Sequence, residues 1–73
     1  MEKIDLHGIK HEAVMQKLDS FFWKVMQKNK SEVEVITGIS DRMKQIVKEV
    51  CKDYNFKVTD HPTNVGCLIV RIN

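Results

Sequence analysis

The chain has 73 residues, of which 42% are hydrophobic and 30% are charged, and its formal net charge is +2. These values are typical of one small globular domain whose core is too small to enclose a deep pocket, so any chemistry is expected on an open face or at a strand end. No segment is apolar for long enough to be a signal peptide or a membrane span. We therefore expect one cytoplasmic domain over residues 1–73, with Cys51 and Cys67 as reduced, buried thiols.

The first half of the chain is predicted to form a strand, a helix and a second strand. Residues 3–7 have strand character and stop at Gly8, and residues 11–29 have helical periodicity. Residues 32–37 alternate Glu with Val, as in a half-exposed strand, until Gly38. The apolar face of the predicted helix consists of Val14, Leu18, Phe21, Phe22 and Val25.

The second half is predicted to form a helix followed by two strands. Ser40 is a favourable N-cap, and the helix is expected to reach about Tyr54. Residues 56–60 and 67–72 are predicted strands, joined by a turn rich in Pro, Asn and Gly, and the apolar run 67–70 indicates burial on both faces. The apolar face of this helix consists of Met43, Ile46, Val47, Val50, Cys51 and Tyr54.

The resulting order, β-α-β-α-β-β, predicts an α/β fold that is a two-layer sandwich, with a four-stranded mixed sheet and two helices. A right-handed strand–helix–strand crossover makes the first two strands parallel, and the short turn makes the last two antiparallel. Ligands of such sheets bind beyond the carboxyl ends of the parallel strands. His7 and Thr37 are therefore expected at the same edge, if the first two strands are close; the order of the strands is left open.

Asp5 and His7 in "IDLHG" point to the same face, because side chains alternate along a strand. We expect Asp5 to accept a hydrogen bond from one ring nitrogen of His7 and to leave the other nitrogen free for proton transfer. The structural alternative is that both residues merely finish the strand.

The segment "VITGIS", residues 35–40, passes from a strand through Gly38 into a helix that begins after Ser40. Free N–H groups and the helix dipole at such a position favour a phosphate. The structural alternative is a tight turn at Gly38. An acid–base pair beside an anion site is the combination that phosphodiester chemistry needs.

These segments resemble a known family. "IDLHG" is similar to the LDxH motif that opens the Smr (small MutS-related) domain, "VITGIS" to its HGxG or TGxG motif, and "NVGCLIVRI" to its closing segment. The resemblance implies a mixed sheet with two helices, binding of DNA or RNA, and endonuclease or nicking activity in many members. It extends to Asp5, His7, Thr37 and Gly38, whereas Ser40 replaces the final glycine of the second motif.

Several other residues are candidates for binding. Lys10 and Arg42 lie near the two strand–helix junctions and are expected to bind phosphate. A lysine ridge, Lys44, Lys48 and Lys52, is either a second phosphate-binding surface or a solvated helix face. Trp23 points away from the apolar face of its helix, where it either stacks on a base, contacts a protein partner or a second copy, or is a half-covered surface residue.

No carboxylate or Cys/His cluster has metal-ligand spacing, so we predict no cofactor, and Mg²⁺ has no ligand cluster to support it. The leading hypothesis is a nuclease in which His7 is the general base or acid and Asp5 orients it. Lys10, Thr37, Gly38, Ser40 and Arg42 would hold the phosphate. The alternative is a non-catalytic module that binds nucleic acid or protein through the same surface.

Overall fold

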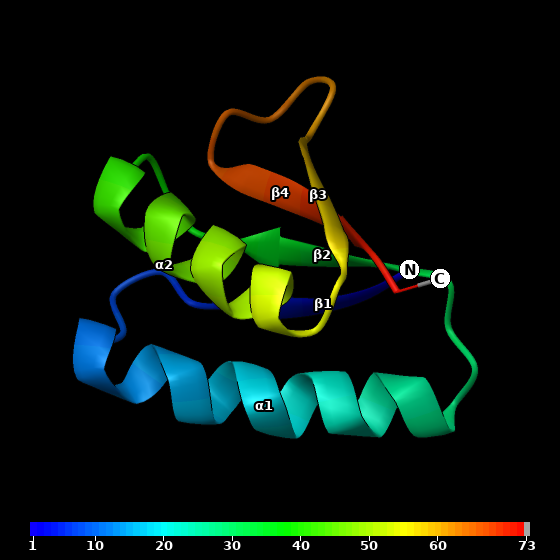
Figure 1. The fold of residues 1–73 in the computed structure, drawn as a ribbon. Coiled ribbons are helices and arrows are strands. Elements are labelled where there is room, and N and C mark those ends of the chain that lie inside the picture. Colours follow the sequence, from blue (N-terminus) through cyan, green and yellow to red (C-terminus); the bar gives the residue numbers. More distant parts are fainter. Residues whose placement is uncertain (73) are drawn as a thin grey trace.

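The structure is a computed structural model that describes residues 1–72 (Figure 1). The chain folds in the predicted order β-α-β-α-β-β. Each boundary lies within two residues of its predicted position. The elements are β1 (Glu2–Asp5), α1 (His11–Gln27), β2 (Glu32–Ile36), α2 (Asp41–Asp53), β3 (Lys57–Asp60) and β4 (Cys67–Arg71).

The four strands form one mixed sheet in the order β1-β2-β4-β3. β1 and β2 are parallel and β3 and β4 are antiparallel, as the crossover rule and the short turn predicted. β4 also pairs antiparallel with β2, which was not predicted. β1 and β2 are neighbours, so their carboxyl ends lie side by side. Both helices begin at that edge, on the left of Figure 1.

Both helices lie on one face of the sheet and pack against each other, which makes a two-layer sandwich (Figure 1). The predicted apolar faces form most of the core, although Phe21, Ile46 and Tyr54 are only half-buried. Phe22 contacts the rings of Tyr54 and Phe56 edge-on, at centroid distances of 5.3 and 5.1 Å. The fully buried side chains are Leu6, Val14, Leu18, Phe22, Val25, Val33, Val35, Val47, Cys51, Leu68 and Val70.

β4 is central in the sheet, but the prediction that it is buried on both faces is only partly right. Leu68 and Val70 are paired with core residues of β2 and are fully buried. Cys67 and Ile69 point to the face without helices, where Cys67 is 3% exposed and Ile69 is half-buried. The cause is that both helices cover the same face, so neighbouring side chains alone shield the other one.

Helix α1 ends at Gln27, two residues before its predicted end. Asn29 adopts a positive φ of 57°, which is the left-handed conformation that commonly terminates helices. The N–H of Lys30 then donates to the carbonyl of Val25. This reversal sends the chain directly into β2.

Candidate functional site

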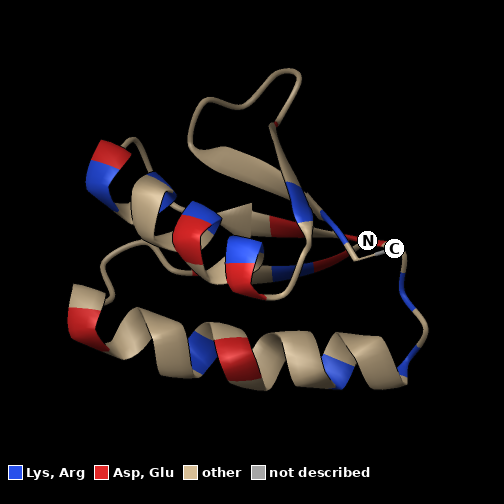
Figure 2. Ribbon diagram, viewed as in Figure 1, with Lys and Arg blue, Asp and Glu red and all other residues tan. Residues whose placement is uncertain are grey.

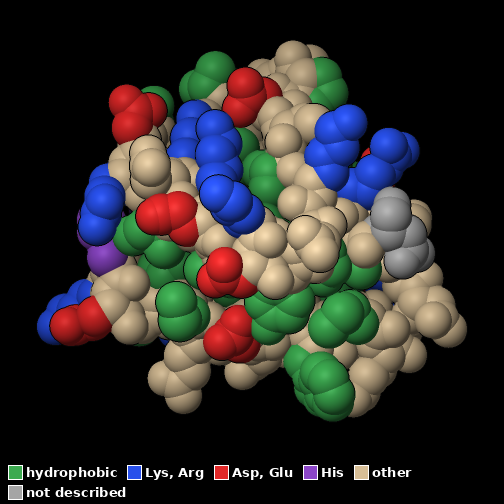
Figure 3. Space-filling view, in the orientation of Figure 1, with side chains coloured by type: hydrophobic (Ala, Val, Ile, Leu, Met, Phe, Trp, Pro, Cys, Tyr) green, Lys and Arg blue, Asp and Glu red, His purple; other side chains and the backbone are tan. Residues whose placement is uncertain are grey.

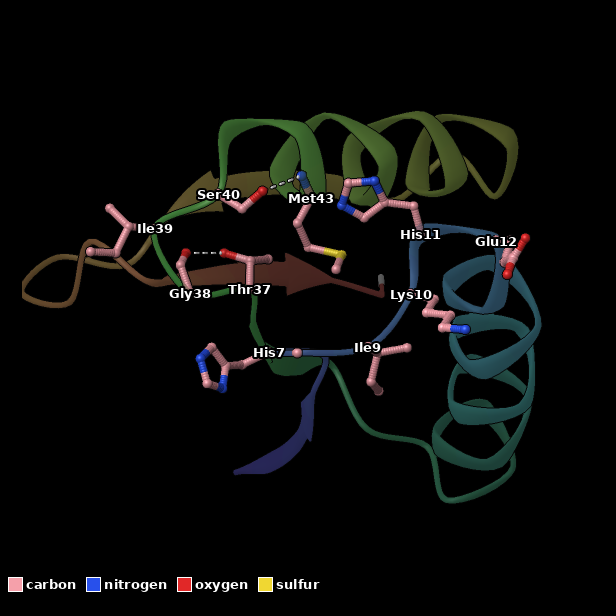
Figure 4. Close-up of a pocket in the computed structure, with 11 residues that line it drawn as sticks. His7, Ile9, Lys10, His11, Glu12, Thr37, Gly38, Ile39, Ser40 and Met43 are labelled. Atoms are coloured by element: carbon pink, nitrogen blue, oxygen red, sulfur yellow. Dashed lines mark hydrogen bonds between the residues drawn. The ribbon is translucent and has the colours of Figure 1, made fainter.

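The loops that follow β1 and β2 meet at one edge of the sheet and line an open pocket of about 680 Å³ (Figure 4). The prediction that His7 and Thr37 lie at the same edge is therefore confirmed. Of the predicted site residues, five line the pocket, whereas Asp5 and Arg42 do not. The lining consists of His7, Gly8, Ile9, Lys10, His11, Glu12, Thr37, Gly38, Ile39, Ser40 and Met43.

His7 is exposed and lies against the backbone of Gly38. Gly38 has a φ of 70°, and a Cβ at this position would lie 3.1 Å from Cδ2 of the imidazole. A glycine is thus needed both for the backbone conformation and for the close approach of the ring. Within residues 1–72, neither ring nitrogen of His7 has a hydrogen-bond partner, so both are available to a ligand.

Asp5 was expected to accept a hydrogen bond from a ring nitrogen of His7, but this hydrogen bond does not form in the structure. Its Oδ1 accepts a hydrogen bond of 2.9 Å from the backbone N–H of His7 instead. The carboxylate therefore secures the backbone from which the imidazole projects, at the point where β1 ends. Its influence on the ring is indirect, through the position of the main chain.

Thr37 is the only buried polar residue among the described residues, at 3% exposure. Its hydroxyl donates to the carbonyls of Gly38 (2.8 Å) and Gly66 (3.2 Å). The carbonyl of Gly66 also accepts from the backbone N–H groups of Thr37 and Gly38, at 2.8 and 3.0 Å. The glycine of "NVGCLIVRI" thus supports the second motif directly, and the N–H of Gly38 is not free for a phosphate.

The start of α2 retains the donors that an anion requires. Oγ of Ser40 accepts from the N–H of Met43 at 3.1 Å, which confirms its prediction as the N-cap. Within the described chain, the N–H groups of residues 39–42 have no hydrogen-bond acceptor. The free donors therefore begin one residue later than expected, after Gly38. The hydroxyl proton of Ser40 is also free to donate, since its oxygen is the acceptor in the cap.

The start of α1 lies at the same pocket. Lys10 occupies its N-cap position, and no side chain caps this helix end. His11, the first residue of α1, also lines the pocket, and Figure 4 shows its ring directed toward the start of α2, near Ser40 and Met43. His11 was not predicted as a site residue. The sequence signal that could have identified it is its position directly after the loop that carries His7 and Lys10.

The lysine ridge of α2 is smaller than predicted. Nζ of Lys44 donates to the carbonyl of Val65, which ties α2 to the β3–β4 loop. Lys48 and Lys52 remain exposed on α2, which carries charges of both signs (Figure 2). Trp23 is 65% exposed and Met15 is 55% exposed, and hydrophobic side chains are visible along the boundary of the two helices (Figure 3). A binding role for Trp23 stays a prediction.

The cysteines are both buried and free, as predicted. Burial raises the pKa of Cys51 to about 12. Burial, together with a hydrogen bond to Glu34, also raises the pKa of Cys67. Neither thiol is therefore ionised near neutral pH, which rules them out as ready nucleophiles.

Residues 1–72 contain no group of three or more His, Cys, Asp and Glu side chains arranged to hold a metal ion. His61 organises the β3–β4 loop, where its Nδ1 accepts from the N–H groups of Thr63 and Asn64. In the same part of the chain, no helix has the length and apolar character needed to cross a membrane.

Comparison with known proteins agrees with this architecture. The family model of the Smr domain matches residues 4–71, nearly the whole chain. The structure is similar to the crystal structure of the Smr domain of Thermus thermophilus MutS2, with a TM-score of 0.90 and 15% sequence identity, over 100% of this chain and 99% of that one. No curated protein matches. At this identity the structural likeness establishes the fold, and the family model carries the assignment.

Proposed function

Because the chain belongs to the Smr domain family, we propose that it binds nucleic acid at the pocket around His7 and cleaves phosphodiester bonds there. The observation that carries this proposal is the convergence of an exposed imidazole, the starts of two helices and Lys10 on one open pocket. An open pocket suits a polymer, which must enter and leave from the side.

The phosphate is held by the start of α2. The free N–H groups of residues 39–42 and the hydroxyl of Ser40 donate to its oxygens, and the dipole of α2 adds to the attraction. Lys10 supplies a positive charge from the other side of the pocket. Arg42 is exposed on the first turn of α2. It contacts the nucleic-acid backbone beside the reacting phosphate rather than that phosphate itself.

His7 transfers the proton. As general base it takes a proton from an attacking water, a bond forms between the water oxygen and phosphorus, and the bond to the departing sugar oxygen breaks. The departing sugar oxygen takes a proton from a second water, and the resulting hydroxide accepts the proton held by His7. The products are a phosphomonoester and an alcohol, and His7 is regenerated. Asp5 positions His7 through its backbone N–H.

A second candidate function is a non-catalytic module that binds nucleic acid or protein through the same surface. The observation that favours it is Ser40, which stands where the family motif has its last glycine. Its Cβ narrows the approach of a phosphate to the backbone. Asp5 also accepts from the backbone N–H of His7, and no acidic side chain of residues 1–72 is hydrogen-bonded to the ring.

The two candidates are separated by incubating the purified protein with plasmid DNA and with structured RNA, with and without Mg²⁺, beside a His7→Ala variant. Nicks or cuts that the wild type makes and the folded variant does not make support the nuclease. Binding without cleavage supports the module. Absence of binding to either polymer at low salt contradicts both nucleic-acid functions.

Binding of nucleic acid is tested by varying the salt concentration and by reversing charges around the pocket. Affinity should fall as salt rises, because phosphate contacts release counterions. Charge reversal at Lys10 and Arg42 should weaken binding more than reversal at Lys48 and Lys52, which are exposed on α2. Equal losses from the two pairs would move the binding surface to α2.

A further inference from the structure

β1 is an edge strand of the sheet, and one side of its backbone has no partner strand. The sheet order ends at β1, which pairs with β2 alone. The N–H of Leu6 donates to the carbonyl of Ile36 on β2. Because backbone direction alternates along a strand, Lys3 and Asp5 direct their N–H and C=O groups away from the sheet. These four groups have no hydrogen-bond partner within residues 1–72.

A groove of about 680 Å³ lies beside this edge, between β1 and α1. Its apolar part is formed by Ile4, Ile9 and Phe21, which are all half-buried. It is separate from the pocket of His7, with which it shares only Ile9. Figure 1 shows β1 as the strand nearest to α1 on this side of the molecule. The groove therefore combines unpaired backbone groups with an apolar surface.

The charge around the groove is mainly positive. Lys17 and Lys24 line it from α1, and a separation of seven residues places them about 10 Å apart along one flank of the helix. Lys3 does not contribute to this charge, because side chains alternate along β1 and that of Lys3 lies on the opposite face from Ile4. Neither Lys17 nor Lys24 forms an ion pair within the described residues. Asp5 is the one carboxylate that lines the groove, and its Oδ1 is already bonded to the N–H of His7.

We propose that this groove binds an extended acidic peptide segment of a partner protein, which adds to β1 as a fifth strand. Its backbone pairs with the outward groups of Lys3 and Asp5, and its apolar side chains pack on Ile4 and Phe21. Because side chains alternate along a strand, the carboxylates that reach Lys17 and Lys24 flank the apolar residue on the same face of the added strand. Addition of a strand to an exposed edge is a common mode of peptide recognition.

The length of the paired segment is limited at both ends. Beyond Asp5, the next outward N–H belongs to His7 and is occupied by the carboxylate of Asp5. At the other end, β1 starts at Glu2. The added strand thus pairs over the four residues of β1. A nucleic-acid strand would use the lysines but not the regularly spaced donors and acceptors of the edge, so the backbone pattern favours a peptide.

The test uses a fluorescent seven-residue peptide, Ser-Glu-Ser-Val-Ser-Glu-Ser (the Glu–Val peptide), with blocked ends, which as a strand presents Glu, Val and Glu on one face, and it measures anisotropy and ¹⁵N-resolved amide shifts of the protein. We expect saturable binding with the largest amide shifts at Lys3 and Asp5. The double variant Lys17→Glu, Lys24→Glu should bind about tenfold more weakly. The double variant Lys48→Glu, Lys52→Glu makes the same charge change on α2 and should bind normally. Melting curves verify that both variants are folded.

Two further probes decide what occupies the groove. In a second peptide, alternate amides carry N-methyl groups, so that the backbone edge facing β1 cannot donate hydrogen bonds. This peptide should bind more weakly if the Glu–Val peptide binds as a strand. Equal affinity of the methylated peptide, or equal loss in the two double variants, would overturn the proposal. A Lys–Val peptide should not bind. The proposal is wrong if the Glu–Val peptide does not bind and the double variant Lys17→Glu, Lys24→Glu loses affinity for a single-stranded oligonucleotide. In that case the groove is a nucleic-acid surface.

Discussion

The imidazole of His7 rests on the backbone of Gly38, so that a Cβ on Gly38 would lie 3.1 Å from Cδ2 of the ring. The two residues belong to different motifs and are brought together by the parallel pairing of β1 and β2. Gly38 is in turn held by the carbonyl of Gly66 in the β3–β4 loop. The position of the candidate catalytic ring thus depends on three separate segments of the chain.

This contact predicts different consequences for two glycines. Gly38→Ala and Gly8→Ala both place a side chain at a positive φ, 70° and 79°, and each should lower the free energy of unfolding by about 1–2 kcal/mol. Only Gly38→Ala also displaces the imidazole, because nothing lies within 4 Å of a Cβ on Gly8. We expect the ring resonances of His7 to shift strongly in the first variant only. Similar shifts in both would show that the contact does not position the ring.

His7→Ala should abolish cleavage while the fold and most of the affinity for nucleic acid are retained. A proton-transfer group contributes about 10²–10⁴-fold to the rate, whereas removal of an exposed side chain changes the stability by about 0.5 kcal/mol or less. The measurement combines cleavage rate, affinity and melting temperature on one preparation. Gln45→Ala is the control, because Gln45 is exposed on α2 and lies outside the pocket. Retained cleavage in folded His7→Ala protein would remove His7 from the mechanism.

The hydrogen bond from His7 N–H to Asp5 Oδ1 predicts that the charge of Asp5 matters less than its oxygen. Asp5→Asn keeps an acceptor at this position and should retain most of the activity. Asp5→Ala leaves the N–H without its partner and should cost about 0.5–1.5 kcal/mol of stability, with a larger loss of rate. Chemical unfolding and cleavage assays of the two variants test this. Equal loss of activity in both would restore a direct electrostatic role for the carboxylate.

Ser40 can be replaced in two ways that separate capping from phosphate access. Ser40→Ala removes the acceptor for the N–H of Met43 and should cost about 1 kcal/mol, whereas Ser40→Gly should cost only a few tenths. Ser40→Gly also restores the glycine of the family motif and opens the backbone to a phosphate. We expect it to strengthen binding of nucleic acid, measured by anisotropy at fixed salt. Weaker binding in Ser40→Gly would show that the hydroxyl itself contacts the phosphate.

The protein should lose stability in alkaline solution. Burial raises the pKa of Cys51 from 9.0 to about 12, so the folded state keeps a proton that the unfolded state releases. The stabilisation is complete below pH 9 and is lost as the pH rises toward 12, by up to about 1.4 kcal/mol per pH unit. The pKa values of Tyr54 and Cys67 are raised too, which acts in the same direction.

Urea unfolding between pH 8 and pH 11 measures this loss. Cys51→Ala should be less stable at neutral pH because it leaves a small cavity, but its stability should fall less steeply with pH. If the two curves are parallel, the thiol of Cys51 is not responsible for the alkaline loss.

The sequence by itself determined the elements, their order and the edge at which the site forms. The periodicities of the helices and strands are local properties, and the parallel direction of β1 and β2 follows from the strand–helix–strand crossover, whereas their adjacency in the sheet was left open. His7 and Thr37 were therefore predicted at one edge, each just ahead of a glycine with a positive φ. These predictions required no knowledge of residues distant in the chain.

Only the tertiary structure decided how the predicted groups are used. β4 lies between β2 and β3, which brings Gly66 to Gly38 and occupies the N–H that was expected to bind phosphate. Asp5 satisfies a backbone N–H at the end of an edge strand instead of a ring nitrogen. Strand order and the partner of each polar group depend on contacts between segments far apart in sequence, and alternation or spacing along one segment contains no information about them. That is why the edge of the candidate site could be predicted from the sequence, whereas the hydrogen-bond partners of its polar groups could not.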